Sequence, residues 1–211
     1  GEAPDAPILA LLPGSRLGEI QRMLPTFLEA ARLLQANVPG LRVLIPAANA
    51  ECRAAINAAV KEHPLPASPC KQGEETSIRV LDGQAQAAMI ASDVVLLASG
   101  TAALEAMLCK RPMVIGHRIS GLTYAIVKAF GLLKSAHVSL PNVLAGETLV
   151  PELLQDACTP SNLHAALLRW FRDAEAVAAL QPRFLAIHET LRRDASARAA
   201  DAVASLIAQP R

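Results

Sequence analysis

A glycine-containing turn between an apolar run and a helical pattern has the residue types of an anion-binding site. The run Val94–Leu97 leads into Ala98-Ser99-Gly100-Thr101-Ala102, and the helical pattern begins at Thr101. Gly100 lets the backbone approach a ligand closely, and the free N–H groups of Thr101 and Ala102 at a helix start favour negative charge. The pattern predicts a phosphate-binding turn that includes Ser99.

A carboxylate follows this turn on the same helical face. Glu105 comes four residues after Thr101, so the two side chains lie one turn apart, about 6 Å along the axis. A ribose diol next to a pyrophosphate would meet this carboxylate, which indicates a nucleotide. Taken alone, the stretch fits equally well an ordinary α/β helix that Ser99 caps, with Glu105 in solvent.

Turns of similar character follow the other predicted strands. In doubly wound α/β sheets, ligands bind outside the carboxyl ends of the strands. The unusual turns of this sequence all fall on that edge, which favours a nucleotide or phosphate site over chance clustering. Besides Ser99–Ala102, these turns are Gly14-Ser15-Arg16, Asp82-Gly83-Gln84, His117-Arg118 and Pro141-Asn142.

Alternating strand and helix patterns position these turns. We expect strands at 8–12, 41–46, 78–81, 94–97 and 112–116, and a sixth strand or extended segment at 138–142. We expect a long helix that begins at Pro25, because proline suits the first helical position, and helices at 50–62, 84–91, 122–133, 150–155, 161–172 and 182 to about 208. The alternation predicts an α/β fold with a doubly wound, mostly parallel, Rossmann-like sheet.

Composition and missing motifs narrow the class of protein. Of the 211 residues, 52% are hydrophobic and 18% charged, enough for a real core, and a net charge of +1 gives no electrostatic basis for binding nucleic acid. P-loop, G-x-G-x-x-G, G-x-S-x-G and H-E-x-x-H motifs are absent, and no cluster has metal-ligand spacing, so we expect no metal or separate cofactor. The four cysteines lack C-x-x-C spacing, which favours reduced thiols in the cytoplasm.

The chain resembles the lipid-A-disaccharide synthases along nearly its whole length. The resemblance rests on Leu12-Pro13-Gly14-Ser15-Arg16, on Ala98–Glu105, and on Val138-Ser139-Leu140-Pro141-Asn142 with Ala145-Gly146 and Val150–Gln155. It implies the carboxy-terminal, UDP-binding half of a bacterial GT-B glycosyltransferase that joins UDP-2,3-diacylglucosamine to 2,3-diacylglucosamine 1-phosphate. On this basis we expect a linker at 1–7, a Rossmann-like UDP-binding domain at 8–173 and a helical extension at 174–211. The family's amino-terminal half would supply the general base.

The resemblance also implies roles for individual residues. Arg16 matches the arginine of the family's P-G-S-R motif and would stabilise charge on a pyrophosphate, as the expected catalytic residue of this half. Glu105 matches the glutamate that takes the ribose hydroxyls, and Asn142 matches the asparagine of the family's P-N pair. By analogy with GT-B enzymes, the backbone of Asp82, Gly83 and Gln84 would face uracil. The full set of expected substrate-binding residues is Gly14, Ser15, Arg16, Asp82, Gly83, Gln84, Ser99, Gly100, Thr101, Ala102, Glu105, Arg118 and Asn142.

The lipid substrates suggest a cytoplasmic protein that sits peripherally on the inner membrane. No run approaches the roughly 18–20 apolar residues of a transmembrane helix, and we expect no signal peptide, because the first residues lack the charged-then-apolar pattern. Residues 118–134 combine apolar side chains with Arg118, Lys128 and Lys134 and contain no acidic residue, as interfacial segments do. Most apolar helix faces in α/β domains belong to the core, however, so base rates favour an ordinary core helix for this segment. The expected partners also include a second copy of the chain, in a homo-oligomer.

Two other interpretations stay open. Another GT-B enzyme that uses a UDP-sugar, such as a peptidoglycan glycosyltransferase or a UDP-sugar 2-epimerase, would retain Glu105 but not the Ser-Leu-Pro-Asn run. The other is a non-catalytic nucleotide-binding module, or a protein-interaction domain that uses the Ala-rich helices; failure to bind any UDP compound, with a partner recovered by pull-down, would favour it.

Overall fold

Six parallel strands form the centre of the protein. The computed structural model describes residues 6–65, 77–98, 100–119 and 137–208. The strand order is β3-β2-β1-β4-β5-β6, and each neighbouring pair is parallel, which confirms the predicted α/β doubly wound sheet. The strands are β1 (Ile8–Leu12), β2 (Arg42–Ala47), β3 (Ile78–Asp82), β4 (Val94–Leu97), β5 (Met113–His117) and β6 (Glu152–Leu154).

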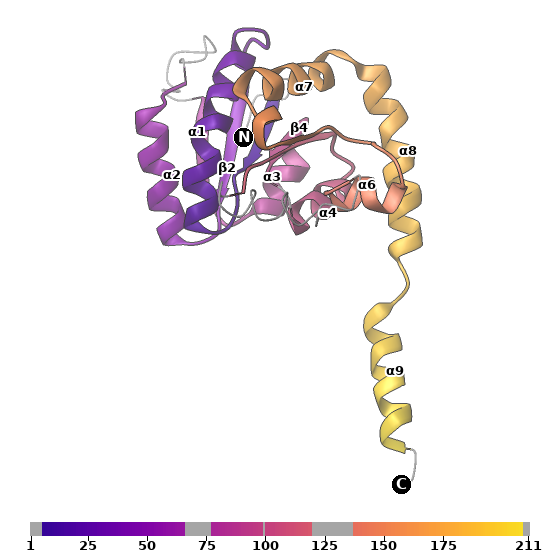
Figure 1. Ribbon diagram of the computed structural model, residues 1–211. Helices are drawn as coiled ribbons and strands as arrows, with labels where there is room; N and C mark the ends of the chain where they lie inside the picture. Colours follow the sequence, from indigo (N-terminus) through magenta and orange to yellow (C-terminus); the bar gives the residue numbers. More distant parts are fainter. Residues whose placement is uncertain (1–5, 66–76, 99, 120–136, 209–211) are drawn as a thin grey trace.

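Helices cover both faces of this sheet (Figure 1). Helix α1 contacts α2 and α7, whereas α4 contacts α3, α6 and α8, so two helical layers enclose the strands. The helices are α1 (Leu17–Gln35), α2 (Ala50–Glu62), α3 (Ala85–Ala91), α4 (Thr101–Leu108), α6 (Leu140–Ala145), α7 (Pro160–Arg172), α8 (Ala174–Leu191) and α9 (Ala195–Ala208), with a 3-10 turn η1 (Gln155–Ala157). Within the described ranges, no helix is long and apolar enough to cross a membrane.

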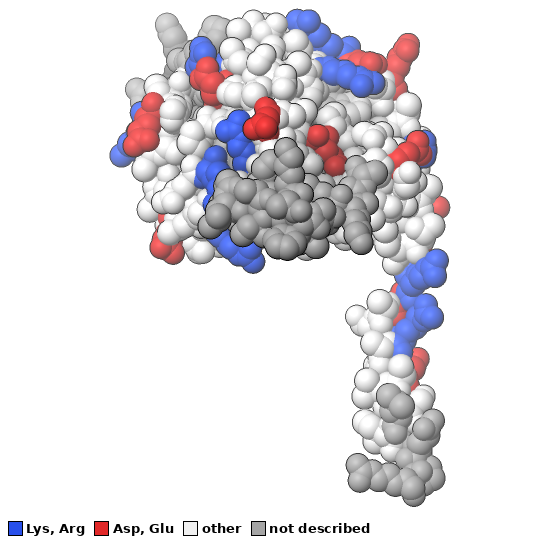
Figure 2. Space-filling view, viewed as in Figure 1, with Lys and Arg blue, Asp and Glu red and all other residues white. Residues whose placement is uncertain are grey.

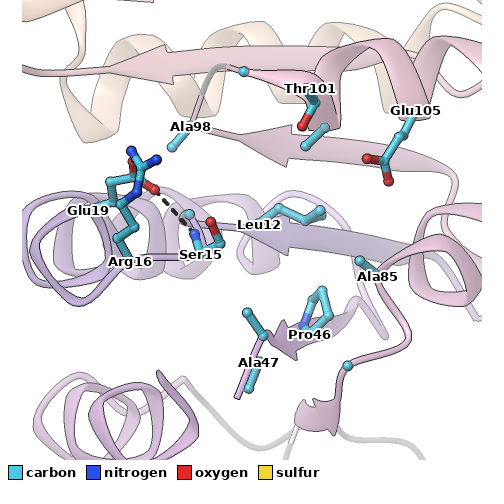
Figure 3. Close-up of a pocket in the computed structure, with 15 residues that line it drawn as sticks. Leu12, Ser15, Arg16, Glu19, Pro46, Ala47, Ala85, Ala98, Thr101 and Glu105 are labelled. Atoms are coloured by element: carbon cyan, nitrogen blue, oxygen red, sulfur yellow. Dashed lines mark hydrogen bonds and ion pairs between the residues drawn. The ribbon is translucent and has the colours of Figure 1, made fainter. Parts of the chain in front are cut away.

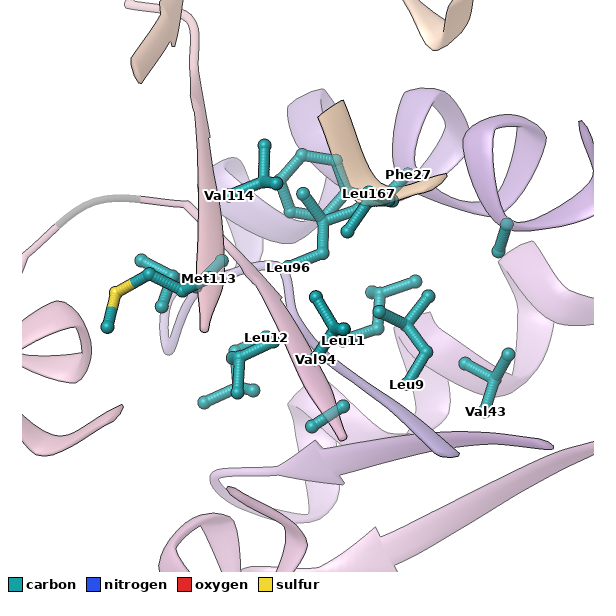
Figure 4. Packing of buried hydrophobic residues seen from close by; sticks show 14 of the residues in the cluster. Leu9, Leu11, Leu12, Phe27, Val43, Val94, Leu96, Met113, Val114 and Leu167 are labelled. Atoms are coloured by element: carbon teal, nitrogen blue, oxygen red, sulfur yellow. The ribbon is translucent and has the colours of Figure 1, made fainter. Parts of the chain in front are cut away.

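The core lies between the sheet and these helices. Strand β1 is buried along its whole length, as expected for a parallel strand covered on both faces. Figure 4 shows Phe27 of α1 and Leu167 of α7 packed against the strand residues Leu96 and Val114. A Cβ at Gly116 of β5 would lie 2.8 Å from Phe27 Cε1, so the glycine allows α1 to approach the sheet.

The first long helix begins eight residues earlier than Pro25, which corrects the predicted start. Helix α1 begins at Leu17 and carries Pro25 in its interior. An interior proline costs about 3 kcal/mol because it removes one N–H and crowds the preceding turn. Burial of an apolar face on both sides of Pro25 outweighs that cost. This face comprises Ile20, Met23, Leu24, Phe27 and Leu28, each at most 1% exposed.

Two short segments exchange their predicted structures. Residues 138–142, expected as a strand, lead into α6, which has Pro141 in its first turn and ends at Gly146 with φ +70. Residues 150–155, expected as a helix, contain β6, which pairs with the exposed edge of β5. Periodicity cannot separate helix from strand over so few residues, and the open sheet edge decided the outcome.

The carboxy-terminal helices also differ from the predicted single helix at 182–208. Helix α8 starts at Ala174, where Asp173 accepts a hydrogen bond from Ala176 N at 2.8 Å, and it carries Pro182 inside. The chain breaks at Asp194, which has φ +50, and α9 then projects away from the body (Figure 1). Leu180 and Phe184 of α8 are buried against the domain. The division at residues 173 and 174 stays a prediction.

Charged side chains are distributed without a large single-sign patch on the face shown in Figure 2. Exposed arginines gather where α8 joins α9, at Arg192, Arg193 and Arg198, and acidic side chains at Glu189, Asp194 and Asp201 accompany them. The described cysteines, Cys52, Cys109 and Cys158, are free thiols. The expected helix at 122–133 lies outside the described residues, as does nearly all of the expected membrane-contact segment 118–134.

Candidate functional site

A pocket of about 430 Å³ opens at the carboxyl ends of β1, β2, β3 and β4 (Figure 3). Strands β1 and β4 are neighbours, but the chain leaves them toward opposite edges of the sheet, to β2 and to β5. Ligands of open α/β sheets bind at such a switch point. The polar lining residues are Ser15, Arg16 and Glu19 after β1 and Thr101 and Glu105 after β4; Gly14, Gly83, Gly100 and Ala102 add backbone.

Most of the predicted site residues meet in this pocket. Of the thirteen, the pocket lining contains Gly14, Ser15, Arg16, Gly83, Gly100, Thr101, Ala102 and Glu105. Ser99 lies outside the described residues. Asp82, Gln84, Arg118 and Asn142 do not line this pocket. The parallel strands bring the turns together at one edge of the sheet. Which side chains face the cavity depends on the hydrogen-bond partners near each of them in the fold.

Three helix N-termini open onto the pocket without side-chain caps. Helix α1 begins after Arg16, α3 after Gln84 and α4 after Gly100, and none of these N-cap side chains accepts a hydrogen bond from its helix. Side chains cap α2, α7 and α8 through Asn49, Thr159 and Asp173, whereas α6, whose residues do not line the pocket, also lacks a side-chain cap. First-turn N–H groups have no partner inside a helix, and the helix dipole adds partial positive charge there. The pocket is therefore suited to an anion such as a diphosphate.

Thr101 and Glu105 present polar groups beside the N-terminus of α4. Gly100 has φ 102 and ψ −158, a conformation that side-chain-bearing residues rarely adopt, and it turns the chain sharply from β4 into α4. Both side chains are exposed, and Figure 3 shows them on the pocket side of α4. A carboxylate next to an anion-binding helix start can accept hydrogen bonds from a hydroxyl pair attached to that anion.

Arg16 and Glu19 form the charged rim at the end of β1. The Arg16 side chain is 84% exposed, and its Nη1 lies 3.4 Å from Glu19 Oε1. Glu19 Oε2 accepts a hydrogen bond from Ser15 N at 3.2 Å (Figure 3). The candidate residues read from the sequence did not include Glu19. Its position as the third residue of α1, where capping-box glutamates occur, is the signal that would have identified it.

Asp82, Gly83 and Gln84 mark the β3 side of the pocket, but their polar groups are partly committed. Asp82 Oδ1 pairs with Arg53 Nη1 at 2.5 Å and lines an adjoining cavity. The Gly83 N–H donates to Ala47 O at 2.7 Å. Gln84 takes the left-handed conformation, with φ 57, that starts α3. The predicted contact of this backbone with uracil stays a prediction.

Arg118 points to backbone carbonyls rather than to the pocket. Its Nε donates to Gln155 O at 3.2 Å, and its Nη2 donates to Cys158 O at 2.5 Å. These contacts fasten the end of β5 to the turn after β6. The neighbouring His117 has a buried Nδ1 without a hydrogen-bond partner among the described residues, and burial lowers the pKa of His117.

Asn142 is fully buried, and all its amide atoms are used. Its Nδ2 donates to Val150 O at 2.9 Å and to Glu152 Oε1 at 2.8 Å, and its Oδ1 accepts from Leu149 N at 2.8 Å and Val150 N at 3.0 Å. The amide thereby links α6 to β6 and to the residues before it by hydrogen bonds. In this conformation Asn142 has no free amide atom for the substrate contact that the sequence predicted.

Glu152 completes this network. It accepts hydrogen bonds from Val138 N and Ser139 N, both at 2.9 Å, and from Ser139 Oγ at 2.6 Å. Burial raises the pKa of Glu152, but the hydrogen bonds from Ser139, Val138 and Asn142 stabilise the carboxylate more, so its pKa lies below the ordinary value. Within the described ranges, no group of three or more His, Cys, Asp or Glu side chains could hold a metal ion.

Comparison with solved structures identifies the architecture. An α,α-trehalose 6-phosphate synthase from Burkholderia multivorans superposes with a TM-score of 0.59 at 14% identity, covering 96% of this chain and 44% of that one. The calicheamicin glycosyltransferase CalG4 gives a TM-score of 0.56 at 21% identity, covering 96% and 42%. At these identities the likeness shows the fold, which is one Rossmann-like half of the GT-B architecture.

Comparison of sequences identifies the family. The family model for lipid-A-disaccharide synthetase matches residues 3–206. A lipid-A-disaccharide synthase of Xanthomonas axonopodis pv. citri is 54% identical over 209 residues, which are 99% of this chain and 46% of that protein. A lipid-A-disaccharide synthase of Xylella fastidiosa is 50% identical over 204 residues, 97% of this chain and 51% of that protein. The chain thus spans about half the length of these relatives, and it belongs to the lipid-A-disaccharide synthetase family.

Proposed function

We propose that this chain is the donor-binding half of a lipid-A-disaccharide synthase. In the full-length enzyme it would bind the UDP part of UDP-2,3-diacylglucosamine, whose sugar is transferred to 2,3-diacylglucosamine 1-phosphate. The observation that carries the proposal is the pocket at the switch point, where three uncapped helix N-termini surround Arg16 and Glu105. We infer the reaction from the names of the matching relatives, and we infer the nucleotide site from the pocket.

Different pocket residues would bind different parts of UDP. The diphosphate would lie between the N-termini of α1 and α4, where N–H groups and the Arg16 guanidinium offset its charge. The Glu105 carboxylate would accept hydrogen bonds from the ribose hydroxyls. The small residues around the cavity, such as Gly14, Gly100 and Ala102, leave room for the ligand to contact the backbone.

The reaction we infer is a direct displacement that inverts the anomeric centre. A base in the other half of the enzyme takes the proton of the acceptor's 6-hydroxyl, the oxygen forms a bond to the anomeric carbon, and the bond from that carbon to the β-phosphate oxygen breaks. Negative charge grows on the departing UDP. Arg16 and the helix N-termini would stabilise that charge as it develops, so this half of the enzyme would need no metal ion.

Titration calorimetry of this chain tests the proposal. UDP should bind with a stoichiometry near one, uridine more weakly, and inorganic sulfate not measurably. The chain alone should transfer no sugar, whereas the full-length enzyme should convert the two substrates to the disaccharide. The proposed role is refuted if the folded chain binds no UDP and if a full-length enzyme whose pocket is filled by a larger side chain keeps its activity.

A further inference from the structure

Glu19 places a negative charge inside the site proposed for a diphosphate. Its carboxylate occupies the Ser15 N–H and faces the Arg16 guanidinium, so it uses one backbone donor and the arginine of the rim after β1. The charged side chains that line the described pocket are one cation, Arg16, and two carboxylates, Glu19 and Glu105. A diphosphate therefore enters a pocket whose ionised side chains sum to negative charge.

The Glu19 carboxylate is held by long contacts. The distances to Ser15 N and Arg16 Nη1 are 3.2 Å and 3.4 Å, whereas strong charge-assisted hydrogen bonds measure about 2.7–2.9 Å. The side chain of Glu19 is 30% exposed and that of Arg16 84% exposed, so water competes for both. A diphosphate carries at least two negative charges, whereas the carboxylate carries one, and its oxygens can take both donors.

A displaced Glu19 carboxylate has partners close by. His117, at the end of β5, has a buried Nδ1 with no hydrogen-bond partner among the described residues. The negative charge of Glu19 raises the pKa of His117, although burial lowers that pKa more. Arg22 lies one turn further along α1 on the same face and is exposed.

We propose that Glu19 lowers the affinity of this site for phosphate groups: its carboxylate occupies the anion-binding turn Gly14–Arg16 in the free protein and must be displaced by the incoming phosphate groups. The inference rests on the proposed function, because it assigns the displacing ligand as a nucleoside diphosphate. A free inorganic anion has to displace the carboxylate without other contacts. A nucleoside diphosphate incurs the same cost, but the contacts of its ribose and base add affinity that an inorganic anion lacks.

The test is calorimetry of wild type and Glu19→Gln with UDP, uridine and inorganic pyrophosphate. Glutamine suits the third position of a helix as well as glutamate does, so the variant removes the charge and retains the cap. We expect UDP and pyrophosphate to bind about tenfold more tightly to Glu19→Gln, because a like charge a few ångströms away is lost. Uridine affinity should stay within about twofold, since uridine is neutral. Glu51→Gln, an exposed carboxylate in the first turn of α2, is the matched control and should change nothing.

The other outcomes are equally decisive. Weaker UDP and pyrophosphate binding in Glu19→Gln would mean that Glu19 holds Arg16 in place for the ligand. Unchanged affinities would leave Glu19 as a helix cap only. If wild type binds no UDP, the proposed function fails, and pyrophosphate still decides the role of Glu19 by tighter or unchanged binding to the variant. Should Glu19→Gln melt well below wild type, the affinities are compared at a lower temperature at which both proteins are folded, with the same increase expected.

Discussion

The carboxylate of Glu19 lies against the Cα of Gly14. A Cβ at position 14 would stand 2.5 Å from Glu19 Oε2 and 2.6 Å from Glu19 Cβ, and Gly14 has φ +125. Either fact alone favours glycine, the first by space and the second by backbone conformation. The turn that enters the pocket from β1 is therefore shaped jointly by Gly14 and Glu19.

Gly14→Ala should lower the free energy of unfolding by about 2–4 kcal/mol, because the new Cβ is strained at positive φ and displaces Glu19. Urea unfolding of the isolated chain measures this. Gly18→Ala is the matched control: a Cβ there meets nothing within 4 Å, and alanine inside α1 should stabilise by about 0.5–1 kcal/mol. Wild-type stability of Gly14→Ala would show that the turn relaxes without Glu19.

Glu105→Ala should weaken UDP binding by about 1.5–3 kcal/mol, the range for hydrogen bonds to a charged group. The side chain is exposed on α4, so the melting temperature should stay near that of wild type. Calorimetry with UDP and with 2′-deoxy-UDP separates the contributions: the deoxy ligand should bind wild type and variant more nearly alike. Equal UDP affinity of the two folded proteins would remove the ribose role.

Arg16→Ala in the full-length enzyme should lower turnover by about a hundredfold or more, since charge on the departing UDP loses a fixed donor. Stability should change little, because the side chain is 84% exposed and its ion pair with Glu19 is long. Lysine should restore only part of the rate, as it lacks the bidentate fork. Steady-state rates measured beside melting curves test this, and near-normal turnover in a stable Arg16→Ala enzyme would contradict the assignment.

Asn142→Ala should destabilise the chain by about 2–4 kcal/mol, because it leaves Leu149 N, Val150 N and Val150 O without their buried partner. The matched control is Asn57→Ala, an exposed residue of α2. Urea unfolding and UDP calorimetry are measured on the same samples. A variant that is as stable as wild type but no longer binds UDP would favour the substrate contact predicted from the sequence.

Stability should fall as the pH drops from 7 to 5, through His117. Burial lowers the pKa of His117, so the unfolded chain takes up a proton near the ordinary value of about 6.5 while the folded chain does not. The stabilisation is thus complete above that value and is lost toward the lower folded pKa. His164, whose pKa is also lowered by burial, adds to the effect. His117→Gln should flatten the pH dependence of the melting temperature and the exposed His63→Gln should not; an unaltered slope in His117→Gln would exclude His117 as its source.

Long elements and the edge that carries the site followed from the sequence. Continuous apolar runs such as Ile8–Leu12 and Val94–Leu97 predict strands covered on both faces, and the structure buries them completely. Parallel strands bring their carboxyl ends to one edge, so the turns at Gly14, Gly83 and Gly100 meet in one pocket. These predictions depend on local pattern and on a general rule of topology.

The start of α1 and the exchange of structure between α6 and β6 depended on tertiary contacts. An interior Pro25 is tolerated only because the residues on both sides of it are buried by the sheet and α7. The segment Glu152–Leu154 is a strand because β5 offers an unpaired edge. Neither the buried face nor the free edge can be read from a short stretch of sequence.

The sequence by itself determined which residue types gather at the carboxyl edge of the sheet: a flexible glycine, a fixed positive charge at Arg16 and a carboxylate at Glu105. Only the tertiary structure decided which polar groups remain available there. Arg118 and Asn142 form hydrogen bonds with backbone groups near β6, and Glu19 lies in the pocket beside Arg16. The physical reason is that a buried polar group takes the nearest partner the fold supplies, and those partners are set by contacts between segments far apart in the chain.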